Sequence, residues 1–333
     1  MIRNALFFCL LLFFSSGTMA LERVVFATNW RAQPAHGGFY QALADGTYER
    51  YGLDVEIRQG WPSINHRPAL LAGKIDILMS ANLLTVFDHY KTRSPTVVVA
   101  AMFQKDPMAF MVHPDQGYET FTDLVKAPVA YVGKELQFTV WPWLKNEFGF
   151  KEEAIRSYNF NLSPFWSNPK SIQECYAIAE PIVTELQGGF KPKVFLMADY
   201  GFSTYSTLLE VRRDMAQKQS DYIQRFVDAS IIGWANYLYG DRTAANALMK
   251  KENPELSDAE MQRAVELIEA LGIVNSGQAK TDGIGAMNPE RVADFYQKMV
   301  RAGLYKADEI DLSKIVNYDF VNKRVGIEIS GSQ

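Results

Sequence analysis

Residues 29–40 read Asn-Trp-Arg-Ala-Gln-Pro-Ala-His-Gly-Gly-Phe-Tyr, and residues 51–57 read Tyr-Gly-Leu-Asp-Val-Glu-Ile. The first stretch follows an apolar run at 23–28, and the second begins another apolar run after a helical pattern at 37–51. A strand, a turn rich in aromatic and histidine side chains, a helix and a second strand are typical of a parallel βαβ unit. Because ligands bind at the carboxyl ends of parallel strands, this turn is a candidate binding loop.

Short apolar runs alternate with helical patterns through the first two thirds of the chain. This alternation predicts an α/β protein whose strands are mainly parallel and joined by crossover helices. Lys105-Asp106-Pro107 separates two apolar runs, at 96–104 and 108–113. A later run at 204–211 leads out of the region that begins at 108. We therefore expect two crossovers and two lobes, each with a mainly parallel sheet flanked by helices. The first lobe is expected to comprise 21–107 and 206–333, and the second, inserted lobe 108–205.

The remaining elements follow from apolar periodicity and from capping signals. A helix is expected at 137–148, where Pro142 is compatible only with the first turn or with a kink. Ser257-Asp258-Ala259-Glu260 is a capping-box pattern before a helix to Leu271, and Asn288-Pro289 begins a helix to Ala302. Further strands are expected at 53–59, 74–80, 96–104, 108–113, 128–133, 175–179 and 193–198.

The N-terminal segment, residues 1–20, has the three parts of a secretory signal peptide: Arg3, an apolar run at 5–14, and a small-residue end at 18–20. The apolar run has about half of the ~20 residues that a membrane-spanning helix needs. We predict cleavage after residue 20 and a periplasmic protein, with an uncleaved anchor as the alternative. Cys9 lacks the small residues that precede a lipidated cysteine, so we do not expect lipidation.

Composition excludes several classes of protein. The net charge of −4 becomes −5 when Arg3 is removed, and this acidic balance argues against nucleic acid or an anionic membrane as partner. Without Cys9, Cys175 is the remaining cysteine and cannot form an internal disulfide. The four histidines lack metal-ligand spacing, and the sequence has no Gly-x-Ser-x-Gly elbow, phosphate-binding loop or cysteine cluster. We therefore expect no metal, no cofactor and no catalytic residue.

Polar and aromatic side chains follow the expected strands, at the edge where ligands bind. Gly37 and Gly38 are expected to let a ligand approach the backbone, and His36 to form a hydrogen bond with it. Core packing is the structural alternative for Trp30, and helix capping is the alternative for the polar residues. The candidate ligand-binding residues are Asn29, Trp30, His36, Gly38, Trp61, Ser80, Asn82, Phe138, Trp166, Tyr176, Glu180 and Asp199.

The middle of the chain is rich in aromatic residues and poor in arginine. Residues 109–205 contain 19 aromatic side chains, against 13% aromatic residues in the whole chain, and Arg156 is their one arginine. Sites for sulfonate, nitrate or phosphate usually benefit from arginine forks, although helix N-termini can replace them. Aromatic walls with Glu180 and Asp199 favour a flat, neutral or weakly cationic heterocycle.

Several motifs resemble those of the NMT1/Thi5-like family of solute-binding proteins, which serve ABC importers. The resemblance covers nearly the whole chain after the signal peptide, and the opening motif is its most specific part. The motifs are Asn29-Trp30, His36-x-Gly38-Phe39-Tyr40-Gln41-Ala42, Gly46-x-Tyr48, Tyr51-Gly52-Leu53-Asp54-Val55, Leu70-Leu71-Ala72-Gly73-Lys74-Ile75-Asp76, Asp123-Leu124, Glu180-Pro181 and Ala198-Asp199-Tyr200-Gly201. The chain departs from the family pattern at 60–65 and at 134–137.

The resemblance implies a type II periplasmic binding protein, a monomer that closes on a small solute and delivers it to the permease and ATPase subunits of an ABC importer. The opening motif is similar to that of members that bind thiamine-precursor pyrimidines. Carried over, Trp30 stacks on the ring, His36 lies beside it and Glu180 bonds an exocyclic amine.

Three alternatives remain: a receptor for a small organic anion such as a sulfonate, taurine or nitrate, a receptor that signals to a membrane sensor, and a pyrimidine synthase. Related synthases carry a cysteine-rich motif where residues 133–136 of this chain have no cysteine. This difference disfavours the enzyme.

Overall fold

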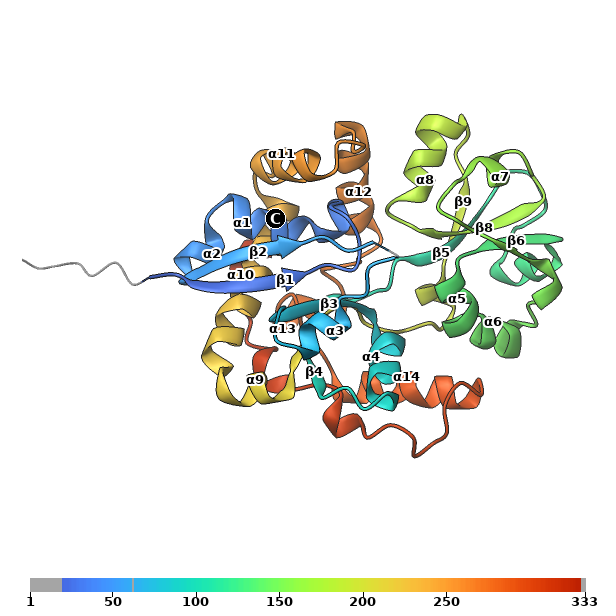
Figure 1. Ribbon diagram of the computed structural model, residues 1–333. Helices are drawn as coiled ribbons and strands as arrows, with labels where there is room; N and C mark the ends of the chain where they lie inside the picture. Colours follow the sequence, from blue (N-terminus) through green and yellow to red (C-terminus); the bar gives the residue numbers. More distant parts are fainter. Residues whose placement is uncertain (1–19, 62, 331–333) are drawn as a thin grey trace, which may run out of the picture.

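The computed structural model describes residues 20–61 and 63–330. Two five-stranded sheets, each accompanied by helices, form two lobes that lie side by side (Figure 1). The predicted signal peptide lies outside the described residues, apart from Ala20. Within these two ranges, no helix is long and apolar enough to cross a membrane.

The first sheet has the strand order β2-β1-β3-β10-β4. β1 pairs in parallel with β2 and β3, whereas β10 runs antiparallel to its neighbours β3 and β4. β10 has the opposite direction because the chain enters it from the second lobe. The strands are β1 (Glu22–Ala27), β2 (Leu53–Arg58), β3 (Ile77–Asn82), β4 (Thr96–Phe103) and β10 (Ser206–Arg212).

The second sheet repeats this plan in the order β7-β6-β8-β5-β9. β6 is parallel to β7 and β8, and β5 is antiparallel to β8 and β9. Each sheet thus has one antiparallel strand, the first one after a crossover, so the predicted two-lobed α/β fold is confirmed with mixed sheets. The strands are β5 (Met108–Val112), β6 (Val129–Val132), β7 (Ile155–Ser157), β8 (Ser171–Tyr176) and β9 (Lys193–Leu196).

The helices pack around the two sheets, and most of them belong to the first lobe (Figure 1). Those of the first lobe are α1 (Gly37–Ala44), α2 (Thr47–Arg50), α3 (Arg67–Leu71), α4 (Leu83–Lys91), α9 (Arg213–Lys218), α10 (Ser220–Tyr239), α11 (Thr243–Glu252), α12 (Asp258–Ala270), α13 (Ala279–Asp282), α14 (Pro289–Arg301) and α15 (Ile327–Ser330). Those of the second lobe are α5 (Lys134–Thr139), α6 (Trp141–Phe148), α7 (Ser163–Trp166) and α8 (Glu180–Val183). Short 3-10 turns include η1 (Pro34–His36), η2 (Phe121–Lys126) and η5 (Met197–Tyr200), and η4 (Thr184–Gly188) is a π-helical turn.

Some element limits differ from the sequence-based expectation. The expected helix at 137–148 is two helices that meet at Val140, because Pro142 lies in the first turn of α6 and cannot continue the hydrogen-bond pattern of α5. The expected strand at 175–179 lies earlier, as β8, and is followed by a turn. The predicted capping box is confirmed: Ser257 and Glu260 each accept a hydrogen bond from the other's backbone N–H.

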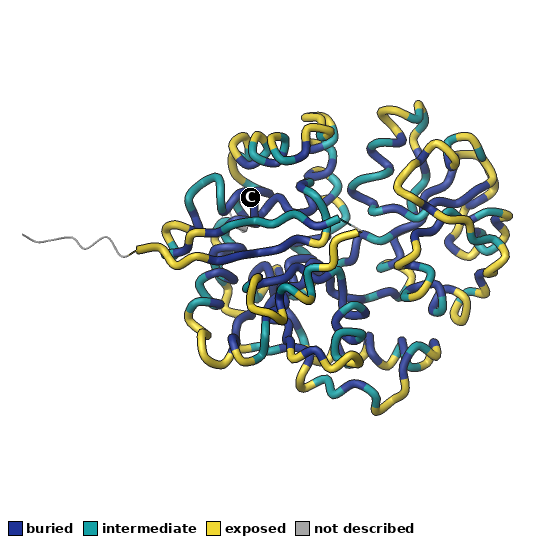
Figure 2. Tube along the Cα trace, viewed as in Figure 1, coloured by how far each residue is buried: buried dark blue, intermediate teal, exposed yellow. Residues whose placement is uncertain are grey.

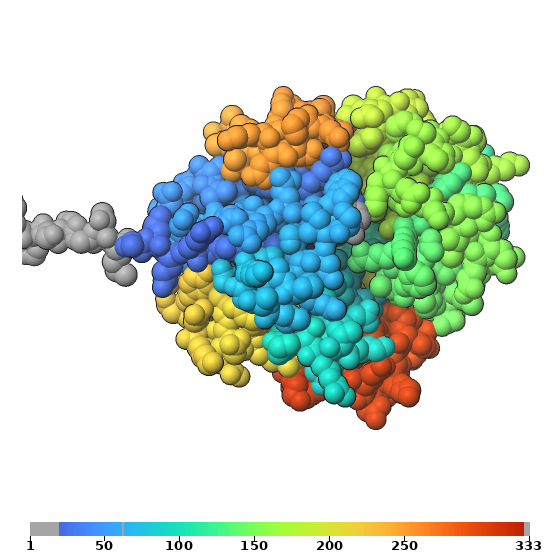
Figure 3. Space-filling view, viewed as in Figure 1, coloured from blue at the N-terminus to red at the C-terminus, as the bar shows by residue number. Residues whose placement is uncertain are grey.

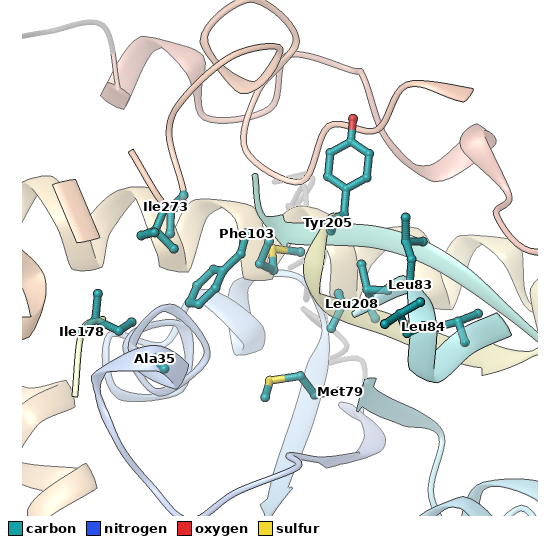
Figure 4. Close-up of a cluster of buried hydrophobic side chains, with 14 of the residues drawn as sticks. Ala35, Met79, Leu83, Leu84, Phe103, Ile178, Tyr205, Leu208 and Ile273 are labelled. Carbon is teal, nitrogen blue, oxygen red and sulfur yellow. The ribbon is translucent and has the colours of Figure 1, made fainter. Parts of the chain in front are cut away.

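The hydrophobic core is continuous between the lobes. Figure 2 shows buried residues along the strands of both sheets and along the inner faces of the helices around them. In Figure 4, Ile178 of the second lobe lies beside Ala35 of the first, with Phe103 and Ile273 nearby, and all four belong to one apolar cluster. The lobes are therefore packed against each other at their junction.

Helix α1 packs closely on α10 through glycines. A Cβ on Gly37 would lie 2.1 Å from the Tyr237 ring, and one on Gly38 would lie 2.2 Å from the Trp234 ring. The space in front of both glycines is thus filled by side chains of α10. We expected these glycines to admit a ligand, and this expectation is corrected: they permit helix packing.

The two crossovers, β4 to β5 and β9 to β10, are held together by Arg291 of α14. Its guanidinium donates hydrogen bonds to the carbonyl oxygens of Gln104 in one crossover and of Ser203 and Thr204 in the other. It also lies 3.9 Å above the centroid of the Tyr205 ring. One partly buried side chain therefore joins the two connections.

Candidate ligand-binding site

Two tryptophans form a platform at the carboxyl ends of β1 and β2. The ring centroids of Trp30 and Trp61 lie 4.8 Å apart. Their loops touch because Gly60 donates its N–H to the Trp30 carbonyl at 3.2 Å, and a Cβ on Gly60 would lie 2.3 Å from the Thr28 carbonyl oxygen. A glycine at this position thus brings the two rings side by side.

The second lobe contacts the first at several points, and one of these contacts lies on the platform. The Phe160 ring, in the loop after β7, lies 4.8 Å from the Trp30 ring. Arg263 of α12 pairs with Glu185 of η4 at 3.1 Å, and Asn146 of α6 donates a hydrogen bond to the carbonyl oxygen that follows α14. The space-filling view shows the lobes in contact on both sides of a narrow crevice (Figure 3). The two tryptophans therefore lie where the lobes meet.

Four carboxyl groups lie on the second-lobe side of this junction, and we call them the carboxyl cluster: Asp106, Glu135, Glu174 and Glu180. Asp106 lies in the first crossover, Glu174 on β8, and Glu135 and Glu180 in the first turns of α5 and α8. Both helices begin after the carboxyl ends of parallel strands, the edge of a sheet that binds ligands.

Burial dominates the electrostatics of the carboxyl cluster. Desolvation, together with the charges of Glu180 and Glu135, raises the pKa of Glu174 to about 8, although the hydrogen bond from the Gly133 N–H lowers it. Burial also raises the pKa of Asp106 to about 6, and it raises the pKa values of Glu135 and Glu180. These groups therefore hold protons more strongly than carboxyls in open solvent do, even though Asp106 alone is fully buried and Glu135 is exposed at its surface.

The carboxyl cluster has neutral hydrogen-bond donors and no cationic partner. Glu180 accepts from the Tyr176 N–H at 2.7 Å and from the Tyr158 hydroxyl at 3.5 Å. Asp106 accepts from the Met108 N–H at 2.8 Å and from the Asn82 amide at 3.1 Å. Across the described part of the chain, no lysine, arginine or histidine forms an ion pair with these four groups. A ligand that carries amino groups would supply the missing donors.

His36 is a buried imidazole without a hydrogen-bond partner. The residue is 1% exposed, and neither ring nitrogen has a partner among the residues that the structure describes. Burial lowers its pKa to about 3, so the ring is neutral at physiological pH. A neutral imidazole can donate from one nitrogen and accept at the other, and both functions are unused here.

The structure brings several of the sequence-predicted residues to the junction. Trp30 and Trp61 form the platform, and Tyr176 and Glu180 are joined by a hydrogen bond in the second lobe. Asn82 caps α4 by accepting from the Leu84 N–H, and it also donates to Asp106, so the structural alternative for this residue, helix capping, is confirmed. Its contact with a ligand stays a prediction. Asn29, at the end of β1, is exposed.

Three other predicted residues form contacts within the protein that account for their positions without a ligand, and a fourth, Phe138, is largely exposed. Ser80 donates its hydroxyl hydrogen bond to the buried Glu210, and Trp166 donates to the Thr184 hydroxyl at 3.2 Å. Asp199 pairs with Lys105 at 3.1 Å, and Phe138 is 72% exposed. These placements give no support to a ligand contact at Ser80, Trp166 or Asp199.

Sequence reasoning did not select Asp106, Glu135, Glu174 or Phe160. Asp106 lies in the polar segment 105–107 that predicts the first crossover, and Glu135 directly follows a predicted strand and turn. The position of either residue in the sequence could therefore have indicated it. Glu174 lies within β8, and only the fold brings it beside Glu180. Phe160 follows a three-residue strand that has no periodic pattern to reveal it.

Metal and nucleophile chemistry have no support in the described residues. No group of three or more histidine, cysteine, aspartate or glutamate side chains among them has a metal-binding arrangement. Cys175 is buried, and burial raises the pKa of its thiol well above the ordinary value. The thiol is therefore protonated and inaccessible as a nucleophile.

Two lobes of this topology, with two crossovers and a ligand face between them, define the fold of the periplasmic solute-binding proteins. The aliphatic sulfonate-binding protein SsuA of Escherichia coli has a TM-score of 0.64 at 14% identity, over 89% of this chain and 92% of that one. The nitrate-binding protein NrtA of Synechocystis PCC 6803 has a TM-score of 0.60 at 11% identity, over 94% of this chain and 89% of that one. The chain belongs to the NMT1/THI5-like family, which matches residues 33–244.

A curated relative in sequence is an enzyme. The 4-amino-5-hydroxymethyl-2-methylpyrimidine phosphate synthase of Schizosaccharomyces pombe is 27% identical over 173 residues, which are 51% of this chain. The match covers 45% of the length of the synthase. The chain thus spans less than half of this relative.

Proposed function

We propose that the protein is a periplasmic receptor that captures a small, flat, amino-bearing heteroaromatic solute between its lobes and delivers it to the permease of an ABC importer. The observation that carries this proposal is the carboxyl cluster, which the Tyr158 and Phe160 side chains connect to the Trp30–Trp61 platform. A planar ring stacks on tryptophan, and its amino groups donate to carboxyl oxygens. An aminopyrimidine of the thiamine-precursor type has both properties.

The charge of the site favours this solute over an anion. A sulfonate or nitrate needs cations or free backbone N–H groups, and the carboxyl cluster repels it. SsuA and NrtA share the fold with this chain at low sequence identity, so their solutes are the second candidate and not the first. The yeast relative is named for a substituted pyrimidine, and a pyrimidine is a heteroaromatic compound of the class that we propose as the solute.

The synthase alternative has one observation in its favour, the identity to the yeast enzyme. Against it, residues 133–136 carry no cysteine motif, and the buried Cys175 is not reactive. We propose a receptor without enzymatic activity. Absorbance spectra of the purified protein with added pyridoxal phosphate test this point, since a synthase of this family would form an absorbing complex with it.

Capture requires movement of one lobe against the other. We propose that the lobes comprise 21–107 with 206–333, and 108–205, that residues 1–20 are removed on export, and that the mature receptor is a monomer. In this scheme His36, Trp30 and Trp61 belong to one lobe and Glu180 to the other, so a solute that touches both sides stabilises the closed form.

The test is a titration of the mature protein with 4-amino-5-hydroxymethyl-2-methylpyrimidine, followed by tryptophan emission and by calorimetry. We expect saturable binding, and we expect Trp30→Ala to weaken it by about 2 kcal/mol, roughly thirtyfold, through loss of stacking. Taurine and nitrate are the comparison ligands. No response to millimolar pyrimidine, beside a clear response to taurine or nitrate, contradicts the heteroaromatic solute. Mass spectrometry of ligand released from the native protein names the solute directly.

A further inference from the structure

Phe160 of the second lobe contacts the first lobe at the tryptophan platform. Its ring centroid lies 4.8 Å from that of Trp30, at an interplanar angle of 62°, and 6.3 Å from that of Trp61. The Tyr158 ring lies behind it at 5.2 Å. Phe160 is 47% exposed, so its ring lies at the edge of the junction and not in a core.

The backbone at Phe160 is held in an unfavourable conformation. Its φ is +59°, in the left-handed region that side chains with a Cβ seldom adopt. The loop is fixed on both sides, because the Tyr158 N–H donates to the Val132 carbonyl and the Ser163 N–H donates to the Asn161 side chain, both at 3.0 Å. Residues held in this way against local preference concentrate at ligand clamps.

The distance between the rings leaves no room for a solute between them. Carbon atoms of stacked rings lie about 3.5 Å apart, so a ring inserted between Trp30 and Phe160 requires a separation of about 7 Å. The observed separation is 4.8 Å. Phe160 therefore occupies the space beside Trp30 that a stacked solute needs.

We propose that Phe160 is a specificity-determining residue of the solute site. Its phenyl ring occupies the place on Trp30 that the solute ring takes, and the solute enters by displacing it. A six-membered heteroaromatic ring has the footprint of a phenyl ring, so it fits the vacated space. A fused bicyclic ring needs a larger displacement, which the anchored loop resists. The site thus selects single-ring solutes, an inference that rests on the proposed function and deepens it.

The experiment compares Phe160→Ala with the wild-type protein by calorimetry. The probes are 4-amino-5-hydroxymethyl-2-methylpyrimidine, with one ring, and 4-aminoquinazoline, with two fused rings. We expect the affinity for the pyrimidine to change by less than about threefold, and the affinity for the quinazoline to rise by about tenfold or more. Phe190→Ala is the matched control, because this second-lobe ring stacks on His113 at 4.0 Å and not on the platform.

An unchanged ratio of the two affinities in Phe160→Ala overturns the inference. A second measurement needs no solute: removal of the ring beside Trp30 is expected to shift the tryptophan emission of the ligand-free protein, and Phe190→Ala is expected to leave it unchanged. An unchanged emission in Phe160→Ala also overturns the inference. If the wild-type protein binds neither probe, the proposed function fails, and the emission measurement alone decides whether Phe160 covers the platform.

Discussion

The two lobes bury carboxyl groups in opposite ways. In the first lobe, Glu210 of β10 is fully buried and accepts hydrogen bonds from the hydroxyls of Ser80 and Thr96 and from His89 at 2.9 Å. Burial alone raises its pKa, but His89 and the two hydroxyls outweigh this effect and lower the pKa below the ordinary value. On the second-lobe side of the junction, no lysine, arginine or histidine among the described residues forms an ion pair with the carboxyl cluster, and desolvation raises all four pKa values.

This difference distinguishes a carboxylate that is satisfied within the fold from the groups to which we assign solute binding. Glu210 already has its hydrogen-bond partners, so a ligand has nothing to add to it. The carboxyl cluster keeps unused acceptor capacity, at a cost in folding stability that protonation reduces and that a ligand with amino groups would offset. Burial of a carboxyl group therefore does not by itself indicate a candidate ligand site. The lack of a cationic partner for the buried group is the stronger indication.

The largest expected effect is a loss of folding stability when Glu210 is replaced. Glu210→Gln removes a buried carboxylate and leaves the donors Ser80, Thr96 and His89 without their anion, so we expect a loss of about 3–5 kcal/mol in the free energy of unfolding. Urea unfolding followed by circular dichroism measures it. Glu174→Gln in the second lobe is the matched control and should not destabilise the ligand-free protein at pH 8. Equal losses in the two variants contradict the distinction between the lobes.

A smaller effect is expected on solute binding. Glu180→Gln removes the charge but keeps an acceptor for the Tyr176 N–H, so we expect the pyrimidine to bind about 1.5–2 kcal/mol more weakly, roughly tenfold to thirtyfold. Calorimetry at pH 8 measures this change. The unfolding midpoint should stay near that of the wild type, and an unchanged affinity shows that Glu180 does not contact the solute.

The pH dependence of stability distinguishes the lobes further. Because the folded-state pKa of Glu174 is raised to about 8, the folded protein holds this proton between about pH 4.5 and 8 while the unfolded chain releases it. The stability of the ligand-free protein therefore falls as the pH rises through this window. Glu174→Gln should flatten the slope by about 1 kcal/mol per pH unit, or roughly 2–4 °C in Tm per pH unit. Thermal unfolding at pH 5, 6.5 and 8 tests this, and a slope that the substitution leaves unchanged contradicts it.

The smallest effect concerns an exposed pair that also joins the lobes. Arg263 and Glu185 are both about two-fifths exposed, and such pairs contribute about 0–1 kcal/mol. We expect Glu185→Gln to change the affinity for the pyrimidine by less than about threefold, and the change to vanish in 0.5 M salt. A large, salt-insensitive loss would show that this pair, and not the carboxyl cluster, controls closure.

The sequence predicted the fold well and the site in part. The two-lobed architecture could be predicted from the alternation of strands and helices, the polar break at 105–107 and the opening motif. Each of these signals lies within a short stretch of sequence. Trp30, Trp61 and Glu180 were selected from the sequence because they follow strands, and their contact with a solute stays a prediction. Glu174 and Phe160 were missed because their importance arises from neighbours far away in the chain. Ser80 and Gly38 were assigned to the ligand because Glu210 and Trp234, their actual partners, lie more than a hundred residues downstream.

The close contact at Gly60 has a consequence for the thermodynamics of recognition. Because the Trp30 and Trp61 loops share hydrogen bonds and backbone contact, we expect the first-lobe surface to need little rearrangement when a solute binds. The conformational entropy lost on binding is then expected to be concentrated in the relative motion of the lobes. A side chain at position 60 would separate the two loops and move part of that entropic cost to the first lobe, so affinity would fall without the loss of a single contact group.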